Sequence, residues 1–146
     1  MQQRILLLGG YGRAGAAIAN VLLTHHPTAH ISLAGRRPDA ARKAASRLAA
    51  EHPDATVDAF PVDATNRTDL REAFNTCDLA VVAAPFRDNG PMVVETAADT
   101  GIDYIDISPD TAKTDAPERL EEPEFVDHLT TILTSILVEG SATGRP

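Results

Sequence analysis

Apolar runs and helical repeats alternate along this chain. Short apolar runs lie at residues 5–8, at residues 31–34 with Ser32 among them, and at residues 79–84; such runs are typical of parallel strands that are buried on both faces. After the first run, apolar side chains recur with helical spacing at Ala14, Ala17, Ile18, Val21 and Leu22. The order of strand, helix and strand predicts a parallel βαβ unit.

The same alternation continues to about residue 110 and predicts one domain over residues 1–110. Strands are expected at residues 4–8, 31–34, 56–60, 78–85 and 103–107. Helices are expected at residues 14–25, 39–51, 68–76 and 91–100. Five strands alternating with helices predict an α/β fold, namely a three-layer, Rossmann-like, doubly wound parallel sheet.

A group of closely spaced glycines lies between the first strand and the first helix. In this group Gly10 is expected to turn the chain tightly off the strand, Gly12 to let backbone N–H groups approach a pyrophosphate, and Gly15 to let the helix pack closely. The phosphates would then lie at the positive end of the helix. A glycine-rich turn without a ligand is the alternative. The residues expected to contact a dinucleotide here are Gly10, Tyr11, Gly12, Arg13, Ala14 and Gly15.

The end of the second strand predicts which dinucleotide is bound. In the NAD-binding form of this fold an acidic residue stands there and binds the ribose hydroxyls, whereas this chain has Arg36 and Arg37. A guanidinium can bind a 2′-phosphate through paired, charge-assisted hydrogen bonds, and the adenine can stack on its plane. The expected cofactor is therefore NADP, with NAD less favoured. The alternative is two solvated arginines at the start of a helix.

The distribution of charge agrees with a phosphate ligand near the N-terminus. Seven of the 13 basic residues but only one of the 21 acidic residues lie in residues 1–47, so we expect basic charge to be concentrated around the phosphate site. The net charge of −8 argues against a nucleic-acid partner, because a phosphate backbone requires a broad basic surface.

Residues after the third and fourth strands complete the predicted site. Asp63 could accept a hydrogen bond from the adenine amine, or it could only order the turn that leads to Thr68. Ala83, Ala84 and Pro85 are small residues at a strand end, where ligands bind in open α/β sheets. They are expected to contact the cofactor near its pyrophosphate and nicotinamide-side ribose, with simple strand-end packing as the alternative.

Length and cysteine content set further limits. A chain of 146 residues is long enough for one domain with a buried core. The single cysteine, Cys77, cannot form an intramolecular disulfide and is expected to be a small buried side chain. A reducing, cytoplasmic compartment fits this composition, and the sequence indicates neither a secretion signal nor a membrane span.

Together these features resemble a known family. The motifs that carry the resemblance are the turn at residues 9–15, Ala34-Gly35-Arg36, Val62-Asp63, the strand at residues 78–85 and Tyr104-x-Asp106-x-Ser108. Over residues 3–110 they are similar to the N-terminal domain of saccharopine dehydrogenase-like proteins. The resemblance implies an NAD(P)-dependent oxidoreductase that forms or cleaves a secondary amine, between an amino acid and a carbonyl compound, by hydride transfer to or from an imine.

The C-terminal part departs from the family pattern, in which a substrate-binding and dimerisation domain follows the fifth strand. Here residues 111–124 are predicted to be a linker, residues 125–139 an extra apolar helix and residues 140–146 a disordered tail. The chain would then be the cofactor-binding part of an oxidoreductase whose substrate domain is missing. The helix either covers a sheet edge or pairs with a second subunit, which would give a homodimer.

The sequence leaves two functions open. The first is an oxidoreductase, of which this chain is the whole or the cofactor-binding part. The second is a non-catalytic NADP-binding module that senses redox state or holds a partner. No catalytic residue can be named: Tyr104 and Asp106 are the candidates near the nicotinamide, and a structural role at the strand end is their alternative. A short-chain dehydrogenase proper is disfavoured, since it requires a lysine four residues after its tyrosine, where this chain has Gly15 after Tyr11 and Ser108 after Tyr104. The histidines show no metal-ligand spacing.

Overall fold

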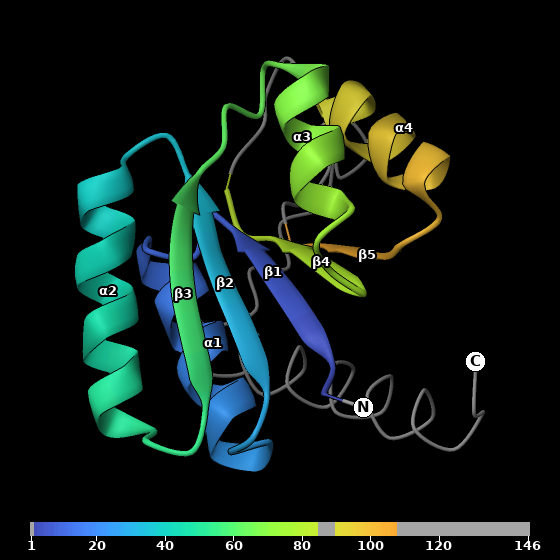
Figure 1. The fold of residues 1–146 in the computed structure, drawn as a ribbon. Coiled ribbons are helices and arrows are strands. Elements are labelled where there is room, and N and C mark those ends of the chain that lie inside the picture. The colour runs from blue at the N-terminus through green and yellow to red at the C-terminus, as the bar shows by residue number, and fades with distance from the viewer. Residues whose placement is uncertain (1, 85–89, 108–146) are drawn as a thin grey trace, which may run out of the picture.

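The computed structural model describes residues 2–84 and 90–107 (Figure 1). Its strands are β1 (Arg4–Leu8), β2 (His30–Gly35), β3 (Thr56–Pro61), β4 (Leu79–Val82) and β5 (Asp103–Asp106). Its helices are α1 (Arg13–His25), α2 (Pro38–Glu51), α3 (Arg67–Phe74) and α4 (Gly90–Thr100). Every strand and helix expected within these ranges is present, with ends that differ by a few residues.

The strands form one parallel sheet in the order β3-β2-β1-β4-β5, which confirms the predicted fold class. The chain runs outward from β1 to β3 and then crosses back to pair β4 with the other side of β1. Leu8 is therefore in register with Ala34 of β2 and with Val82 of β4. In sheets of this kind ligands bind at the carboxyl ends of the strands, at the point where the strand order reverses. That point lies between β1 and β4.

Helices cover both faces of the sheet, with α1 and α2 on one side and α3 and α4 on the other (Figure 1). Successive side chains of β1 point to opposite faces, so Ile5 and Leu7 join the core under α1 and α2. Leu6 and Leu8 join the second core, under α3 and α4. This two-sided burial explains why the first strand is a continuous apolar run.

At the amino ends of the strands, an ion pair joins β1 to β4. The carboxylate of Asp78 accepts from the backbone N–H of Arg4 at 2.9 Å and from its guanidinium at 3.1 Å. Burial alone would raise the pKa of Asp78, but the hydrogen bonds and charge of Arg4 outweigh it and lower that pKa. This end of the sheet is opposite the glycine turn.

The cysteine is the small buried side chain that the sequence predicted. Cys77 lies in the core between the sheet and α3, and its Sγ donates to the carbonyl oxygen of Phe74 at 3.3 Å. Burial raises the pKa of the Cys77 thiol to about 12. A thiol of this kind is protonated at neutral pH and is a poor nucleophile.

Several sequence predictions fall outside the described residues. These are the contact of Pro85, the linker at residues 111–124, the helix at residues 125–139 and the tail at residues 140–146. No helix in the described ranges is long and apolar enough to cross a bilayer.

Candidate functional site

The tight turn after β1 is made by Gly9, not by Gly10 as the sequence analysis expected. Gly9 has a φ of 82°, which side-chain-bearing residues rarely adopt. A Cβ on Gly9 would also lie 2.8 Å from the Cβ of Ala84. Gly10 has no positive φ, but a Cβ there would lie 2.9 Å from the backbone carbonyl oxygen of Leu7, which favours glycine at this position too.

Gly15 has the role predicted for it. A Cβ on Gly15 would lie 2.5 Å from both the Cα of Gly10 and the carbonyl oxygen of Gly9. Real Cβ atoms do not approach backbone atoms so closely, so only glycine lets α1 begin directly on the turn. The backbone of the turn and the first turn of α1 therefore lie in contact.

The N-terminus of α1 presents backbone N–H groups without a side-chain cap. Gly12 is the N-cap residue; its own N–H donates to the carbonyl oxygen of Gly9 at 3.0 Å, and the first turn contains no acidic residue. Arg13 and Ala14, the first two residues of the helix, are exposed. The first N–H groups of a helix have no acceptor within the helix, so this end can bind an anion such as a pyrophosphate.

Tyr11 links this turn to the end of β2. A Cβ on Gly35 would lie 2.6 Å from the Tyr11 hydroxyl oxygen, so the ring packs directly on the backbone of Gly35. The Tyr11 hydroxyl accepts from the backbone N–H of Arg37 at 3.3 Å, and the Arg37 guanidinium lies 5.3 Å from the centre of the ring. The glycine turn and the segment that precedes α2 are thus held together.

Arg36 lies between Gly35 and Arg37 and is exposed. The hydrogen bonds and ion pairs found among residues 2–84 and 90–107 do not engage its side chain. Its charge acts on Asp63, at the end of β3, and contributes to lowering the pKa of that carboxyl group. An exposed guanidinium is therefore available beside the uncapped end of α1, at the ends of two neighbouring strands.

Asp63 orders the turn after β3. Its Oδ1 accepts from the backbone N–H of Thr65 at 2.9 Å and from the Thr65 hydroxyl at 2.7 Å. These two bonds are the main reason that the pKa of Asp63 lies below its usual value. The turn-ordering role is present in the structure, and the contact with adenine stays a prediction.

Ala83 and Ala84 pack the end of β4 against the glycine turn. The N–H of Ala83 donates to the carbonyl oxygen of Leu8 at 2.8 Å, and Ala84 lies against Gly9. Larger side chains at Ala84 would push on the turn itself. Strand-end packing is thus observed, and a cofactor contact at this position is compatible with it.

Tyr104 and Asp106, the candidates on β5, pair with each other. The hydroxyl of Tyr104 donates to Oδ2 of Asp106 at 3.1 Å. Burial, followed by the charge of Asp106, raises the pKa of Tyr104 above its usual range. The structural role at the strand end is thus observed for both residues, and a catalytic role for them stays a prediction.

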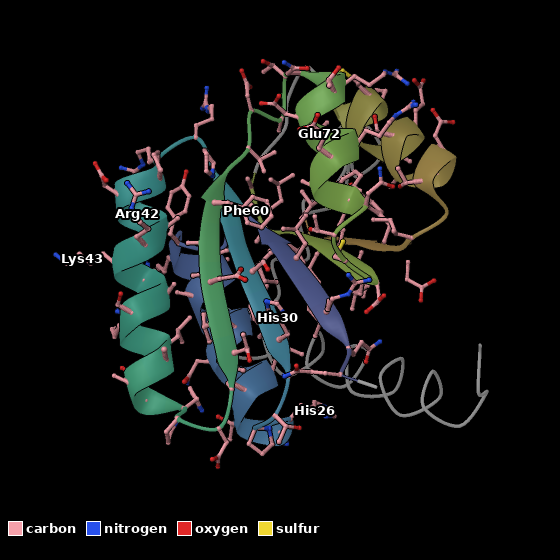
Figure 2. All side chains as sticks on the ribbon, in the orientation of Figure 1. His26, His30, Arg42, Lys43, Phe60 and Glu72 are labelled. Carbon is pink, nitrogen blue, oxygen red and sulfur yellow. The ribbon has the colours of Figure 1, made fainter. Side chains whose placement is uncertain are left out.

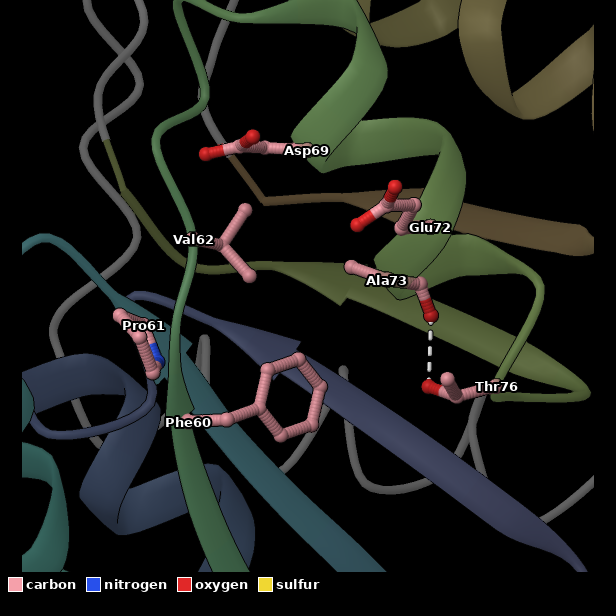
Figure 3. Close-up of a pocket in the computed structure, with 7 residues that line it drawn as sticks. All are labelled: Phe60, Pro61, Val62, Asp69, Glu72, Ala73 and Thr76. Carbon is pink, nitrogen blue, oxygen red and sulfur yellow. Dashed lines mark hydrogen bonds between the residues drawn. The ribbon is translucent and has the colours of Figure 1, made fainter.

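A hollow of about 320 Å³ lies between β3 and α3 (Figure 3). Phe60 and Val62 of the β3 segment face Glu72 and Ala73 of α3 across it (Figure 3). Figure 2 shows Phe60 on β3 on the side opposite Arg42 and Lys43 of α2. The lining contains none of the predicted site residues.

The expectation that basic charge is concentrated at the phosphate site is only partly right. Arg4 lies at the opposite end of the sheet in its pair with Asp78, and Arg47 lies far along α2 beside Glu51. The described part of the chain contains no group of three or more histidine, cysteine, aspartate or glutamate residues that could hold a metal ion.

Comparisons with known proteins agree with this geometry. The sequence profile of the family described as "Saccharopine dehydrogenase NADP binding domain" matches residues 5–130. Comparison with curated protein sequences gives no match.

Solved structures share the fold. The apo form of the L-Glu-forming saccharopine dehydrogenase from Saccharomyces cerevisiae superposes with a TM-score of 0.57 and 22% identity, over 73% of this chain and 22% of that one. A wide-type short-chain dehydrogenase/reductase from Veillonella parvula, in complex with NADP, superposes with a TM-score of 0.60 and 19% identity, over 92% and 64% of the two chains. A short-chain type dehydrogenase/reductase from Mycobacterium ulcerans gives a TM-score of 0.65 at 17% identity, over 97% and 64%. This chain thus spans less than two thirds of the length of each.

Proposed function

The chain belongs to the saccharopine dehydrogenase NADP-binding domain family, and from this premise we propose that it binds NADP(H) in preference to NAD(H). The observation that carries the proposal is the placement of Arg36 beside the uncapped N-terminus of α1, where Leu8 and Ala34 are in register at the ends of β1 and β2. The pyrophosphate and the 2′-phosphate of NADP are attached to the 5′ and 2′ positions of the same adenosine ribose. The N-terminus of α1 and the guanidinium of Arg36 are matched to these two groups.

The residues of this chain divide the binding between them. The backbone N–H groups of Arg13, Ala14 and Gly15 hold the pyrophosphate at the end of α1, and Gly12, which has no side chain, lets it approach them. Arg36 holds the 2′-phosphate through charge-assisted hydrogen bonds.

The remaining contacts lie at the ends of β3 and β4. Asp63 lies at the adenine end, with its second carboxylate oxygen as the acceptor for the exocyclic amine. Ala83 and Ala84 border the pyrophosphate and the nicotinamide-side ribose, where their small size leaves room for the ligand. The contact of Pro85, which lies outside the described residues, stays an expectation from the sequence. These contacts follow from the positions of the strand ends.

We propose further that the chain is the cofactor-binding part of an oxidoreductase. When bound, the nicotinamide supplies hydride transfer, and this chain supplies binding and orientation. The family resemblance suggests a substrate with an amine or imine beside a carboxylate. Since the chain spans 22% of the yeast saccharopine dehydrogenase, groups that bind such a substrate are expected in a further domain or a partner chain.

A second candidate is a non-catalytic NADP-binding module. The observation that favours it is that the Tyr104 hydroxyl donates to Asp106 on the same strand, which is a structural role for both residues. A cytoplasmic location and a homodimer formed through residues 125–139 remain proposals for either candidate. Turnover of NADPH with amino-acid and keto-acid mixtures separates the two: sustained oxidation favours the enzyme, and tight binding without oxidation favours the module.

Parallel titrations with NADPH and NADH, followed by fluorescence of the reduced nicotinamide, test the cofactor preference. Because a hydrogen bond to a charged group contributes about 1.5–3 kcal/mol, the unaltered chain is expected to prefer NADPH by about tenfold to a hundredfold. Arg36→Ala is expected to remove most of that preference. Arg47→Ala is the matched control, since it removes the same charge from an exposed position on α2.

An equal affinity for both nucleotides in the unaltered chain would contradict the proposal. So would a loss of preference in Arg47→Ala as large as that in Arg36→Ala, because the effect would then be one of overall charge.

A further inference from the structure

Three residues interlock at the junction of the glycine turn and the end of β2. We define this contact as the Tyr11 clamp, which consists of Tyr11, Gly35 and Arg37. Gly35 provides the space, since any side chain there would overlap the Tyr11 ring. Arg37 provides two contacts, one from its backbone N–H to the Tyr11 hydroxyl and one from its guanidinium to the ring face.

The clamp engages the backbone N–H and the guanidinium of Arg37. With the backbone N–H bound and the guanidinium stacked, the conformation of the residue that follows Arg36 is fixed, and the Arg37 charge is held on the ring face. Both arginines are exposed, but Arg36 takes part in neither contact. The two adjacent arginines are therefore not equivalent.

We propose that Tyr11 is a specificity-determining residue, which holds Arg37 so that Arg36 is positioned for the 2′-phosphate of NADP(H). Arg36 is then the phosphate-binding arginine and Arg37 a positioning residue. Because Tyr11 belongs to the glycine turn, the clamp also fixes the distance between the pyrophosphate and the 2′-phosphate positions. This inference rests on the proposed function. It assigns a role to Tyr11, which lies between Gly10 and Gly12 at a position where the glycine pattern does not require a particular residue.

The proposal separates the two nucleotides. NADH lacks the 2′-phosphate and binds through the pyrophosphate and adenine contacts only, so a loosened clamp leaves its affinity nearly unchanged. NADPH loses the benefit of a correctly placed Arg36. The same contrast is expected between adenosine 2′,5′-bisphosphate and adenosine 5′-diphosphate, which test the adenosine end alone.

Tyr11→Phe is the main test, because it keeps the ring and removes only the hydroxyl that accepts from Arg37. We expect a loss of NADPH affinity of about threefold to tenfold, the range for one hydrogen bond, with NADH affinity changed by less than twofold. In the Arg36→Ala background, Tyr11→Phe is expected to cause no further loss. This non-additivity is the signature of a residue that acts through another.

Arg37→Ala tests the division of roles between the arginines. It is expected to reduce the preference for NADPH by less than Arg36→Ala does. Gly35→Ala, which adds a Cβ against the Tyr11 ring, is expected to reduce the preference for NADPH at least as much as Tyr11→Phe does, because it displaces the whole ring. Circular dichroism of each variant establishes that it is folded before it is titrated.

Three results would overturn the inference while leaving the proposed function intact. The first is an equal loss of affinity for NADPH and NADH in Tyr11→Phe. The second is an undiminished loss of NADPH affinity when Tyr11→Phe is made in the Arg36→Ala background. The third is a larger loss of NADPH preference in Arg37→Ala than in Arg36→Ala. Failure of the unaltered chain to bind either nucleotide would instead refute the proposed function, and the inference with it.

Discussion

Replacing Gly15 with alanine tests the contact between α1 and the glycine turn. The added Cβ would lie 2.5 Å from the Cα of Gly10 and from the carbonyl oxygen of Gly9. That is about 1 Å closer than a favourable contact between heavy atoms. Both neighbours are backbone atoms, which cannot rotate away as a side chain can. Helix α1 must therefore move off the turn.

The expected cost follows from two opposing effects. Overpacking costs about 1–3 kcal/mol, and the upper end applies here because the obstacle is backbone. Alanine is favoured over glycine within a helix by about 1 kcal/mol. Gly15→Ala is therefore expected to lower the free energy of unfolding by about 2 kcal/mol, and the midpoint of thermal unfolding by about 4–8 °C.

Gly90→Ala is the matched control, since a Cβ on Gly90 at the start of α4 meets nothing within 4 Å among the described residues. Its free energy of unfolding is expected to change by less than about 0.5 kcal/mol. Thermal and urea unfolding followed by circular dichroism measure both variants. If Gly15→Ala were as stable as Gly90→Ala, the close contact between helix and turn would be refuted.

Three further predictions concern ionisable groups. The folded-state pKa of Asp78 is lowered from 3.8. Its pair with Arg4 therefore stabilises the fold above about pH 4, and this stabilisation is lost as the pH falls through the folded-state pKa. Acid unfolding of Asp78→Asn should show a shallower pH dependence than that of the unaltered chain. Cys77, with its pKa raised to about 12, should react with a thiol reagent at pH 8 only as fast as the protein opens, and prompt labelling of the folded chain would contradict its burial. The pKa of Tyr104, measured by absorbance in a Tyr11→Phe background, should lie above the usual value of about 10. Asp106→Asn should lower the pKa of Tyr104. An unchanged titration in that variant would show that Asp106 does not act on Tyr104.

The fold was predictable because its strands carry a strong local signal. Ile5, Leu6, Leu7 and Leu8 are all buried, since helices cover both faces of the sheet, and a run of this kind is visible in the sequence. Edge strand β3 is exposed on alternate residues and was predicted from its alternating pattern. Within residues 2–84 and 90–107 the differences from the predicted elements are confined to strand and helix ends, which depend on capping and packing.

The details of the site depend on contacts between distant segments. The sequence does not show which of two adjacent glycines has the positive φ, because that depends on Ala84 and Leu33 packing against Gly9 and Gly10. The hydrogen bond between Tyr11 and Arg37 spans 26 residues and exists because β1 and β2 are neighbours. The position of Arg4 was predictable, since the first residue of a strand lies at the end opposite its carboxyl-terminal turn.

The most direct test of the central claim is to map NADPH binding residue by residue, using the backbone amide shifts of the isotopically labelled chain. The account predicts that the amides that shift most belong to residues 9–16, 34–37 and 63–65, at the ends of β1, β2 and β3. Amides of Glu72 and Thr76, beside the hollow between β3 and α3, should stay in place. Shifts centred on that hollow, or no shifts at saturating NADPH, would contradict a dinucleotide site at the glycine turn.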